Sequence, residues 1–315
     1  MRRSLQTLLV SVIALSTAGL TACIPLDGKA ERSFTASEAK PSQLVIEARF
    51  LDVDLSVAKD AMVAIDAKVI LKTNGGNETA EREIEKCVVR VEREGDTLYI
   101  RQGKKDERLS VSSYSGSGFL KVALPADVPF RISTASGNVA MNGDFGSVAA
   151  VLQVASGDVN GDLGVGSFVS ESASGDTKVA LRHPVTMVEC DTASGDIAIS
   201  APSIAKAKLA SASGDVSLRG MAGPLTISVA SGDVDVTFVE FPASAVTAVE
   251  TASGDIVIRL PSGAAPSGAI TTASGEIKLG VPGTTSKRGA TLTGSGAAIT
   301  ASAASGDVRI SAGTP

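Results

Sequence analysis

The chain has 315 residues, of which 43% are hydrophobic and 3% aromatic, with 32 glycines and no tryptophan. It holds 29 lysines and arginines against 34 aspartates and glutamates, a formal net charge of −5. This nearly balanced charge lacks the basic excess of nucleic-acid-binding proteins, so we expect no nucleic-acid partner. The composition favours a β-rich protein of the cell envelope.

The N-terminal residues have the features of an export signal. Met1-Arg2-Arg3 is positive, and residues 5–20 are almost entirely apolar or small, too short a stretch for a comfortable bilayer span. The sequence Leu20-Thr21-Ala22-Cys23 then resembles the lipobox of bacterial lipoproteins, in which the cysteine is acylated and becomes the new N-terminus. Residues 1–22 are therefore predicted to be a lipoprotein signal peptide, and Cys23 is predicted to be lipidated. An ordinary signal peptide with an incidental cysteine is the alternative.

The residues after Cys23 predict where the anchor places the protein. Two or more acyl chains make membrane anchoring stable. Position 24 is Ile rather than Asp, which by resemblance to enterobacterial sorting favours the outer membrane and leaves the face open. Residues 23–42 are polar without apolar periodicity, so we expect a lipid anchor followed by a flexible tether spanning about 25 Å. No later segment is long and apolar enough to span a bilayer.

Residues 43–130 are predicted to form an N-terminal β-strand region. Apolar and polar residues alternate over 51–57, as in half-buried strands. Residues 89–100 read as a hairpin around Glu94-Gly95-Asp96. The charge-rich segment 78–86 fits a short helix or a solvated loop, and the Gly/Ser-rich segment 104–118 is expected to be a loop.

Residues 131–315 repeat a short motif. Ala-Ser-Gly followed by Asp, Asn or Glu occurs nine times, at spacings of 18 to 22 residues and a last spacing of 31 that holds an insertion. A period near 20 residues indicates a solenoid. The turn glycines are Gly137, Gly157, Gly175, Gly195, Gly214, Gly232, Gly254, Gly275 and Gly306.

Columns of like residues appear when the repeats are aligned. Positions three before the alanine, directly after the acidic residue and two further on are mostly apolar, and the position between the last two is mostly polar or small. Such alternation in register describes strands stacked around one core. We therefore predict an all-β chain, a single-stranded β-helix or β-solenoid with rungs of about 20 residues, preceded by a β-sheet portion.

Each residue of the repeated turn has a structural explanation. Glycine adopts positive φ without a Cβ clash, and Ser and Asp side chains can bond backbone amides at the bend. Carboxylates stacked about 4.8 Å apart repel by about 0.9 kcal/mol in water, so the column must be solvated, hydrogen-bonded or bridged by cations. Turn capping is favoured, because the Gly-Gly-x-Gly-x-Asp calcium repeat is missing. The alternative is a weak cation ladder on Asp158, Asp176, Asp196, Asp215, Asp233 and Asp255.

Residues suited to catalysis are scarce. His183 is the only histidine and reads as a turn residue, so we predict no catalytic site, no bound metal and no cofactor. Cys87 and Cys190 could form a disulfide in an oxidising compartment. Cys190 stands in an apolar column, which equally fits a buried small hydrophobic residue.

Three stretches resemble the DUF4097 family of candidate adhesins from bacterial envelopes: Gly95 to Ile100, Val122 to Pro129, and the Ala-Ser-Gly-Asp repeats. The resemblance runs from about residue 44 to 310. It implies a β-helix with a sheet-like N-terminal portion, and it supplies no catalytic residues.

Three classes of function remain. The leading hypothesis is a non-enzymatic, lipid-anchored protein that presents a solenoid surface for adhesion or binding to an unidentified protein or glycan. An envelope-stress sensor or scaffold acting through a protein partner is the alternative. A polysaccharide-active enzyme is disfavoured by short rungs and few aromatic residues. Self-association through a lightly capped last rung is also expected.

Overall fold

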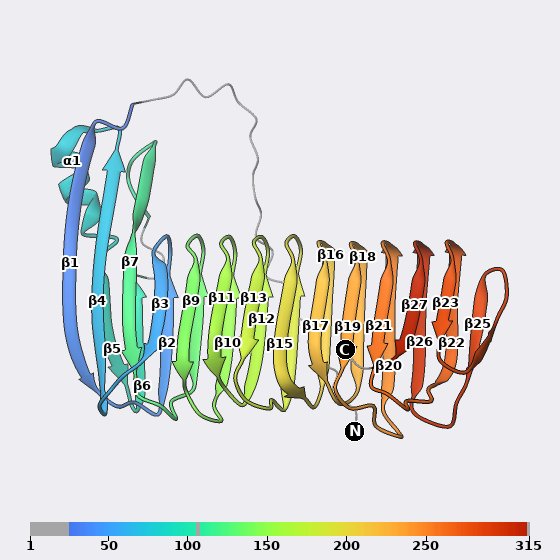
Figure 1. Ribbon diagram of the computed structural model, residues 1–315. Helices are drawn as coiled ribbons and strands as arrows, with labels where there is room; N and C mark the ends of the chain where they lie inside the picture. The colour runs from blue at the N-terminus through green and yellow to red at the C-terminus, as the bar shows by residue number, and fades with distance from the viewer. Residues whose placement is uncertain (1–24, 105–107, 314–315) are drawn as a thin grey trace, which may run out of the picture.

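The computed structural model describes residues 25–104 and 108–313, which form two long β-sheets with a helix, α1 (Gly76–Ile84), at one end (Figure 1). In sheet A the strands lie in the spatial order β1 (Gly28–Ala39), β4 (Met62–Thr73), β7 (Tyr114–Leu124), β3 (Asp52–Val57), β9 (Val139–Asp144), β11 (Val159–Gly164), β13 (Thr177–Leu181), β15 (Ile197–Ile204), β17 (Val216–Met221), β19 (Val234–Phe238), β21 (Ile256–Leu260), β27 (Val308–Ala312) and β23 (Ile277–Gly280). In sheet B the order is β24 (Gly283–Thr285), β25 (Gly289–Thr293), β22 (Ser267–Ser274), β26 (Ala298–Ser305), β20 (Val246–Ser253), β18 (Leu225–Ser231), β16 (Ala207–Ser213), β14 (Met187–Thr192), β12 (Ser167–Ser172), β10 (Ala149–Val154), β8 (Phe130–Thr134), β2 (Gln43–Ala48), β6 (Thr97–Gln102) and β5 (Val89–Glu94).

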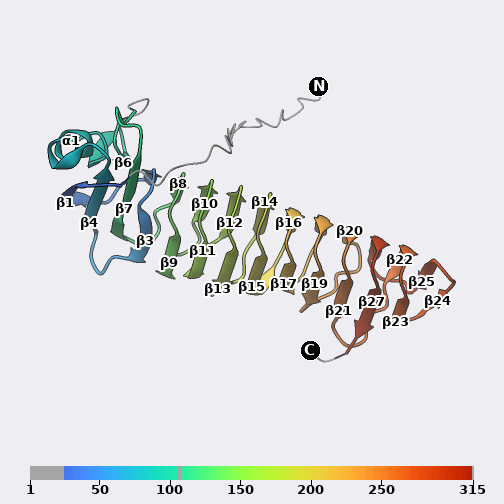
Figure 2. The ribbon, with the colours of Figure 1, turned by 90° about the horizontal axis from the view of Figure 1, so that it is seen from above.

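Each regular rung supplies one strand to each sheet. The Ala-Ser-Gly-Asp turn joins the two, so β10 leads into β11 and β12 into β13, and Figure 2 shows the resulting two rows of strands. Successive rungs pair in parallel and in register, for example Val159 with Val139 on one side and Thr177 on the other. The predicted all-β solenoid is confirmed.

The apolar columns meet between the two sheets. Leu152 and Leu209 of sheet B, and Val159 and Val216 of sheet A, are at most 1% exposed. They belong to one hydrophobic cluster that runs through the whole described part of the chain. Apolar residues therefore face inward and polar residues outward, as the alternation in the sequence indicates.

The last repeat does not lie at the end of the stack. β26 lies between β20 and β22, and β27 lies between β21 and β23. The insertion in the long last spacing forms β24 and β25, an antiparallel pair that continues sheet B beyond β22. The expectation that the last rung is lightly capped is therefore wrong, because the chain turns back after the insertion and places that rung inside.

The N-terminal end shows the same arrangement. β2 lies between β6 and β8, and β3 lies between β7 and β9, so the first rung in the sequence is also an inner rung. β5 and β6 form the predicted hairpin. The charge-rich segment left open by the sequence is helical, since α1 occupies most of it.

Two expectations about loops are wrong. Residues 28–39 of the predicted tether form β1, which pairs antiparallel with β4 over its whole length. Ala30, Arg32 and Phe34 lie on one face of β1: Ala30 is buried, Phe34 is half-buried against the core, and Arg32 pairs with Glu81 of α1 and with Glu85 directly after it. Likewise β7 begins inside the predicted loop 104–118, because its first residues pair with β4. The predicted signal peptide and Cys23 lie outside the described residues.

Candidate functional site

The repeated turns stack at very close distance. All nine turn glycines adopt positive φ, between 116° and 155°. A Cβ on Gly157 would lie 2.2 Å from the carbonyl oxygen of Gly137, and one on Gly214 would lie 2.2 Å from that of Gly195. Glycine is therefore required at these positions for two reasons: the backbone has positive φ, and the neighbouring rung leaves no room for a side chain.

The acidic column is a continuous hydrogen-bond ladder. The Oδ1 of Asp158 accepts the backbone N–H of Asp176 at 3.0 Å, and the Oδ1 of Asp176 accepts that of Asp196 at 3.0 Å. The aspartates thus cap amides of the neighbouring turn rather than of their own. In spatial order the ladder comprises Asp52, Asn138, Asp158, Asp176, Asp196, Asp215, Asp233, Asp255, Asp307 and Glu276.

This ladder accounts for the aspartates without a cation. The pKa of Asp176 is lowered, first by Lys178, whose Nζ lies 2.7 Å from Oδ2, and then by the amide of Asp196. Among residues 25–104 and 108–313, no group of His, Cys, Asp and Glu side chains is arranged to hold a metal ion. The geometry favours turn capping over the weak cation ladder.

Asp52 belongs to the ladder although it follows no Ala-Ser-Gly motif. It stands at the start of β3, and its Oδ1 accepts the amide of Asn138 at 2.8 Å. The only sequence signal is the apolar residue that follows it, Val53, which occupies the same column as Val139.

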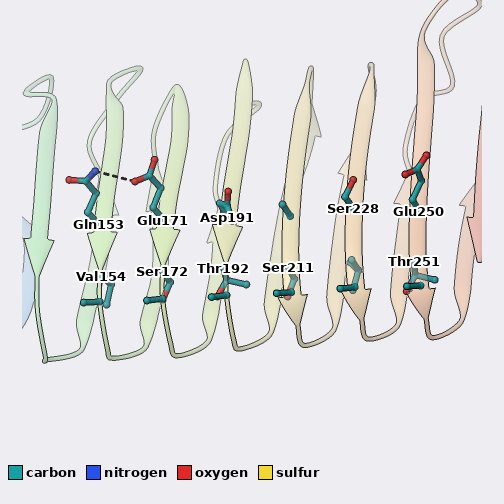
Figure 3. Close-up of a pocket in the computed structure, with 18 of the residues that line it drawn as sticks. Gln153, Val154, Glu171, Ser172, Asp191, Thr192, Ser211, Ser228, Glu250 and Thr251 are labelled. Atoms are coloured by element: carbon teal, nitrogen blue, oxygen red, sulfur yellow. Dashed lines mark hydrogen bonds between the residues drawn. The ribbon is translucent and has the colours of Figure 1, made fainter. Parts of the chain in front are cut away.

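A long groove runs along sheet B beside the turns. It encloses about 1460 Å³ and is lined by the motif alanine and the two residues before it from each of the nine repeats, and by Ala48 of β2. The groove extends from Ala48 to Ala273, across ten neighbouring rungs and therefore about 43 Å. In Figure 3 the two positions before the alanine form parallel rows, Gln153 to Glu250 and Val154 to Thr251.

The outer row of the groove is polar and acidic. Glu171, Asp191 and Glu250 are exposed, and the Gln153 Nε2 donates to a Glu171 carboxylate oxygen at 3.1 Å. Among the described residues that line the groove, none is a lysine, arginine or histidine. Its electrostatic character is therefore negative, and the turn aspartates add to this along the neighbouring edge.

Several hydroxyls in the inner row of the groove, the position directly before the motif alanine, form hydrogen bonds with the turns. The Ser172 and Thr192 hydroxyls donate to turn carbonyls at 3.2 and 3.3 Å, and both side chains are largely buried. The surface offered to a ligand is consequently a shallow floor of alanines and small residues with a polar border.

Cys87 and Cys190 do not form the disulfide that the sequence left open. Cys87 and Cys190 are both buried and unbridged to each other. Cys87 precedes β5, and six strand spacings separate β5 from the strand of Cys190, a distance of about 29 Å. A disulfide needs Cα atoms within about 7 Å. Burial raises the pKa of the Cys190 thiol, which leaves it protonated and a poor nucleophile.

His183 links two rungs. Its Nε2 lies 2.8 Å from Asp144 Oδ2, and both side chains are about half exposed. The contact passes over Gly164, where a Cβ would lie 2.7 Å from the imidazole. Asp144 has a lowered pKa, first because of His183 and then because of the Gly146 amide. The histidine therefore reads as an inter-rung contact.

No helix in the described residues combines the length and apolar character needed to cross a membrane. No curated protein matches the chain. Among solved structures, the chain is similar to a candidate adhesin from Parabacteroides merdae (12% identity, 91% of this chain and 97% of that chain, TM-score 0.48). It is also similar to one from Parabacteroides distasonis (15%, 90% and 98%, 0.43) and one from Bacteroides fragilis (12%, 89% and 97%, 0.42).

The family assignment rests on the sequence itself. The profile of the Toastrack DUF4097 family matches residues 42–311, which include the N-terminal strands from β2 onward and every Ala-Ser-Gly-Asp rung. The chain therefore belongs to the Toastrack DUF4097 family.

Proposed function

We propose that this is a non-enzymatic binding protein of the bacterial cell envelope, anchored by lipid on Cys23, that holds an extended ligand in the groove of sheet B. The observation that carries the proposal is the groove itself, which repeats the same three positions over nine rungs and continues to Ala48 on a tenth. A ligand that follows such a groove must be long, because each rung offers only three side chains on a shallow surface.

The cell-envelope location rests on sequence features. The lipobox-like segment before Cys23 supports a lipid anchor, and Ile24 favours the outer membrane. The solved structures to which the chain is similar are named candidate adhesins, which agrees with a location in the cell envelope.

The described side chains support binding rather than catalysis. The groove contains carboxylates and hydroxyls, but the buried Cys190 lies in the core and His183 contacts Asp144 at the opposite bends. Hydrolysis would require a general base within hydrogen-bond reach of a nucleophile. Cys190 and His183 both lie away from the groove and do not supply such a pair there.

Capture from native envelopes tests the proposal. The immobilised mature protein is exposed to solubilised envelopes and to a panel of envelope glycans, and the retained material is identified. Ala193→Arg with Ala230→Arg fills the groove with two long cationic side chains, because both alanines line it and are exposed.

The matched control places the same charges on the outer face of sheet A, as Ser200→Arg with Ser217→Arg. We expect retention to be lost only in the groove variant. Retained glycan would indicate an adhesin, and one stoichiometric protein would indicate a scaffold. Equal retention by both variants would exclude the groove, and turnover of any glycan would exclude a purely binding role.

A further inference from the structure

The N-terminal strands extend beyond the edge formed by the repeated turns. Figure 1 shows β1, β4 and β7 reaching past the row of bends. Gly28 pairs with Thr73, and Thr73 pairs with Tyr114, so these three residues lie side by side at the extremity. We call this extremity, with Lys29 and Lys72 in the next positions, the N-terminal tip.

The tip lies close to the predicted lipid. Cys23 is five residues before Gly28, and five residues span at most about 18 Å. The predicted tether of 23–42 would have allowed the fold to move freely, but β1 begins at Gly28 and removes most of that length. An acylated Cys23 therefore keeps the tip within a short distance of the bilayer surface.

The side chains of the tip suit a lipid headgroup region. Tyr114 is 53% exposed, one of the few large apolar side chains so exposed in the described residues. Tyrosine is enriched where membrane and water meet, because its ring is apolar and its hydroxyl polar.

A pair of lysines adds positive charge. Lys29 and Lys72 are opposite each other on neighbouring strands, where like charges are unfavourable. Lys29 is bonded to Glu31, but Lys72 forms no ion pair within the described part of the chain. An anionic phosphate group opposite Lys72 would compensate this repulsion.

The geometry points to the N-terminal tip as a membrane-contact surface whose partner is the headgroup region of the bilayer that holds the lipid anchor. This inference rests on the lipid anchor of the proposed function. It also assigns a role to the long strands: β7 extends from Phe119, opposite Asp52 of the acidic ladder, to Tyr114. Five residues add about 17 Å, roughly two Debye lengths at physiological salt. The acidic ladder is thereby kept away from an anionic membrane.

The absence of tryptophan makes the test direct. The full lipidated chain carrying Tyr114→Trp is reconstituted into vesicles of phosphatidylethanolamine and phosphatidylglycerol with brominated acyl chains, which quench nearby tryptophan. The control is Val246→Trp, because Val246 is 59% exposed at the start of β20, at the bends opposite the repeated turns.

We expect the fluorescence of the Tyr114→Trp protein to fall by about half and that of the Val246→Trp protein to stay unchanged. Adding Lys72→Ser should weaken the quenching, and more so when phosphatidylglycerol is present. Sedimentation with the vesicles without quenching at position 114 would overturn the tip contact alone. A chain that does not sediment would contradict the lipid anchor and the tip contact with it.

Discussion

The regular rungs in the middle of the molecule and the rungs at its two ends share one sheet geometry but differ in order. From β8 to β21, chain order and spatial order coincide, and each rung between β10 and β19 pairs with the repeats before and after it. At both ends, the first and last rungs lie inside, covered by strands that are adjacent in space but not in sequence. A solenoid of identical repeats leaves an open edge at each end. Here irregular strands cover these edges except at the C-terminal end of sheet A, where β23 remains the edge strand.

Removing the last rung should have the largest effect. Without residues 297–315, β20 and β21 lose their outer partners and β22 to β25 lose their attachment to the stack. We expect hydrogen exchange to show that β22 to β25 unfold, because each rung depends on its neighbours. Deletion of 313–315 alone is the control. Continued protection of β22 to β25 in the longer deletion would mean that the C-terminal strands fold independently of the stack.

A glycine comparison should give the next largest effect. Gly214→Ala introduces a Cβ against the Gly195 carbonyl at a φ of 132°, and should lower the free energy of unfolding by about 3 kcal/mol. Gly95→Ala also changes a glycine of positive φ, but nothing lies within 4 Å of its Cβ, so about 1 kcal/mol is expected. Denaturant unfolding of both variants measures the difference. An equal decrease in the free energy of unfolding for both variants would show that the stacking of the turns adds nothing to the requirement for glycine.

The carboxylate ladder offers a smaller effect. Asp196→Ala removes the acceptor of the Asp215 amide and should cost about 1 kcal/mol. Asp196→Asn keeps an amide oxygen in the same place, as Asn138 does naturally, and should cost less than about 0.5 kcal/mol. Denaturant midpoints distinguish the two substitutions. If Asn is as damaging as Ala, the charge rather than the hydrogen bond stabilises the column.

The smallest effect concerns pH at the N-terminal end. Bonds from Lys29 and Lys68 hold the pKa of Glu31 down to about 2, from an ordinary value of 4.5. The folded pKa is lower than the unfolded one, so this stabilisation is present at neutral pH and lost as pH falls from about 4.5 to about 2. The melting temperature of Glu31→Gln should depend less on pH in that range. High salt should shrink the difference, because these side chains are exposed.

The regular rungs could be predicted from sequence because their determinants are local and periodic. The columns around Leu209 and Val216, and the glycines of the turns, follow from alternation and from the conformational freedom of glycine. The aspartate ladder could be predicted only as a local cap. The bond from each carboxylate to the next turn could not be predicted, because it depends on how closely the turns stack on one another.

Apart from the hairpin of β5 and β6, the arrangement of the ends could not be predicted, because many of the strand partners there are distant in sequence. β1 has a weak alternation, which becomes clear only once Ala30 and Phe34 are known to pack against the core. The insertion of β27 between β21 and β23 leaves no periodic signal beyond the last spacing of 31 residues. The groove could not be predicted either. The turn explains each of its lining alanines individually, and they form a surface only when ten rungs are placed side by side.

Native-state hydrogen exchange of the full chain tests most directly the central claim that every Ala-Ser-Gly-Asp rung belongs to one continuous stack. Residues 298–312, which form β26 and β27, should exchange as slowly as residues 207–221 in the middle, because strands pair with them on both sides. Edge strands β23 and β24 should exchange faster. Rapid exchange throughout 298–312 would contradict the inserted last rung and with it the continuous ladder and groove.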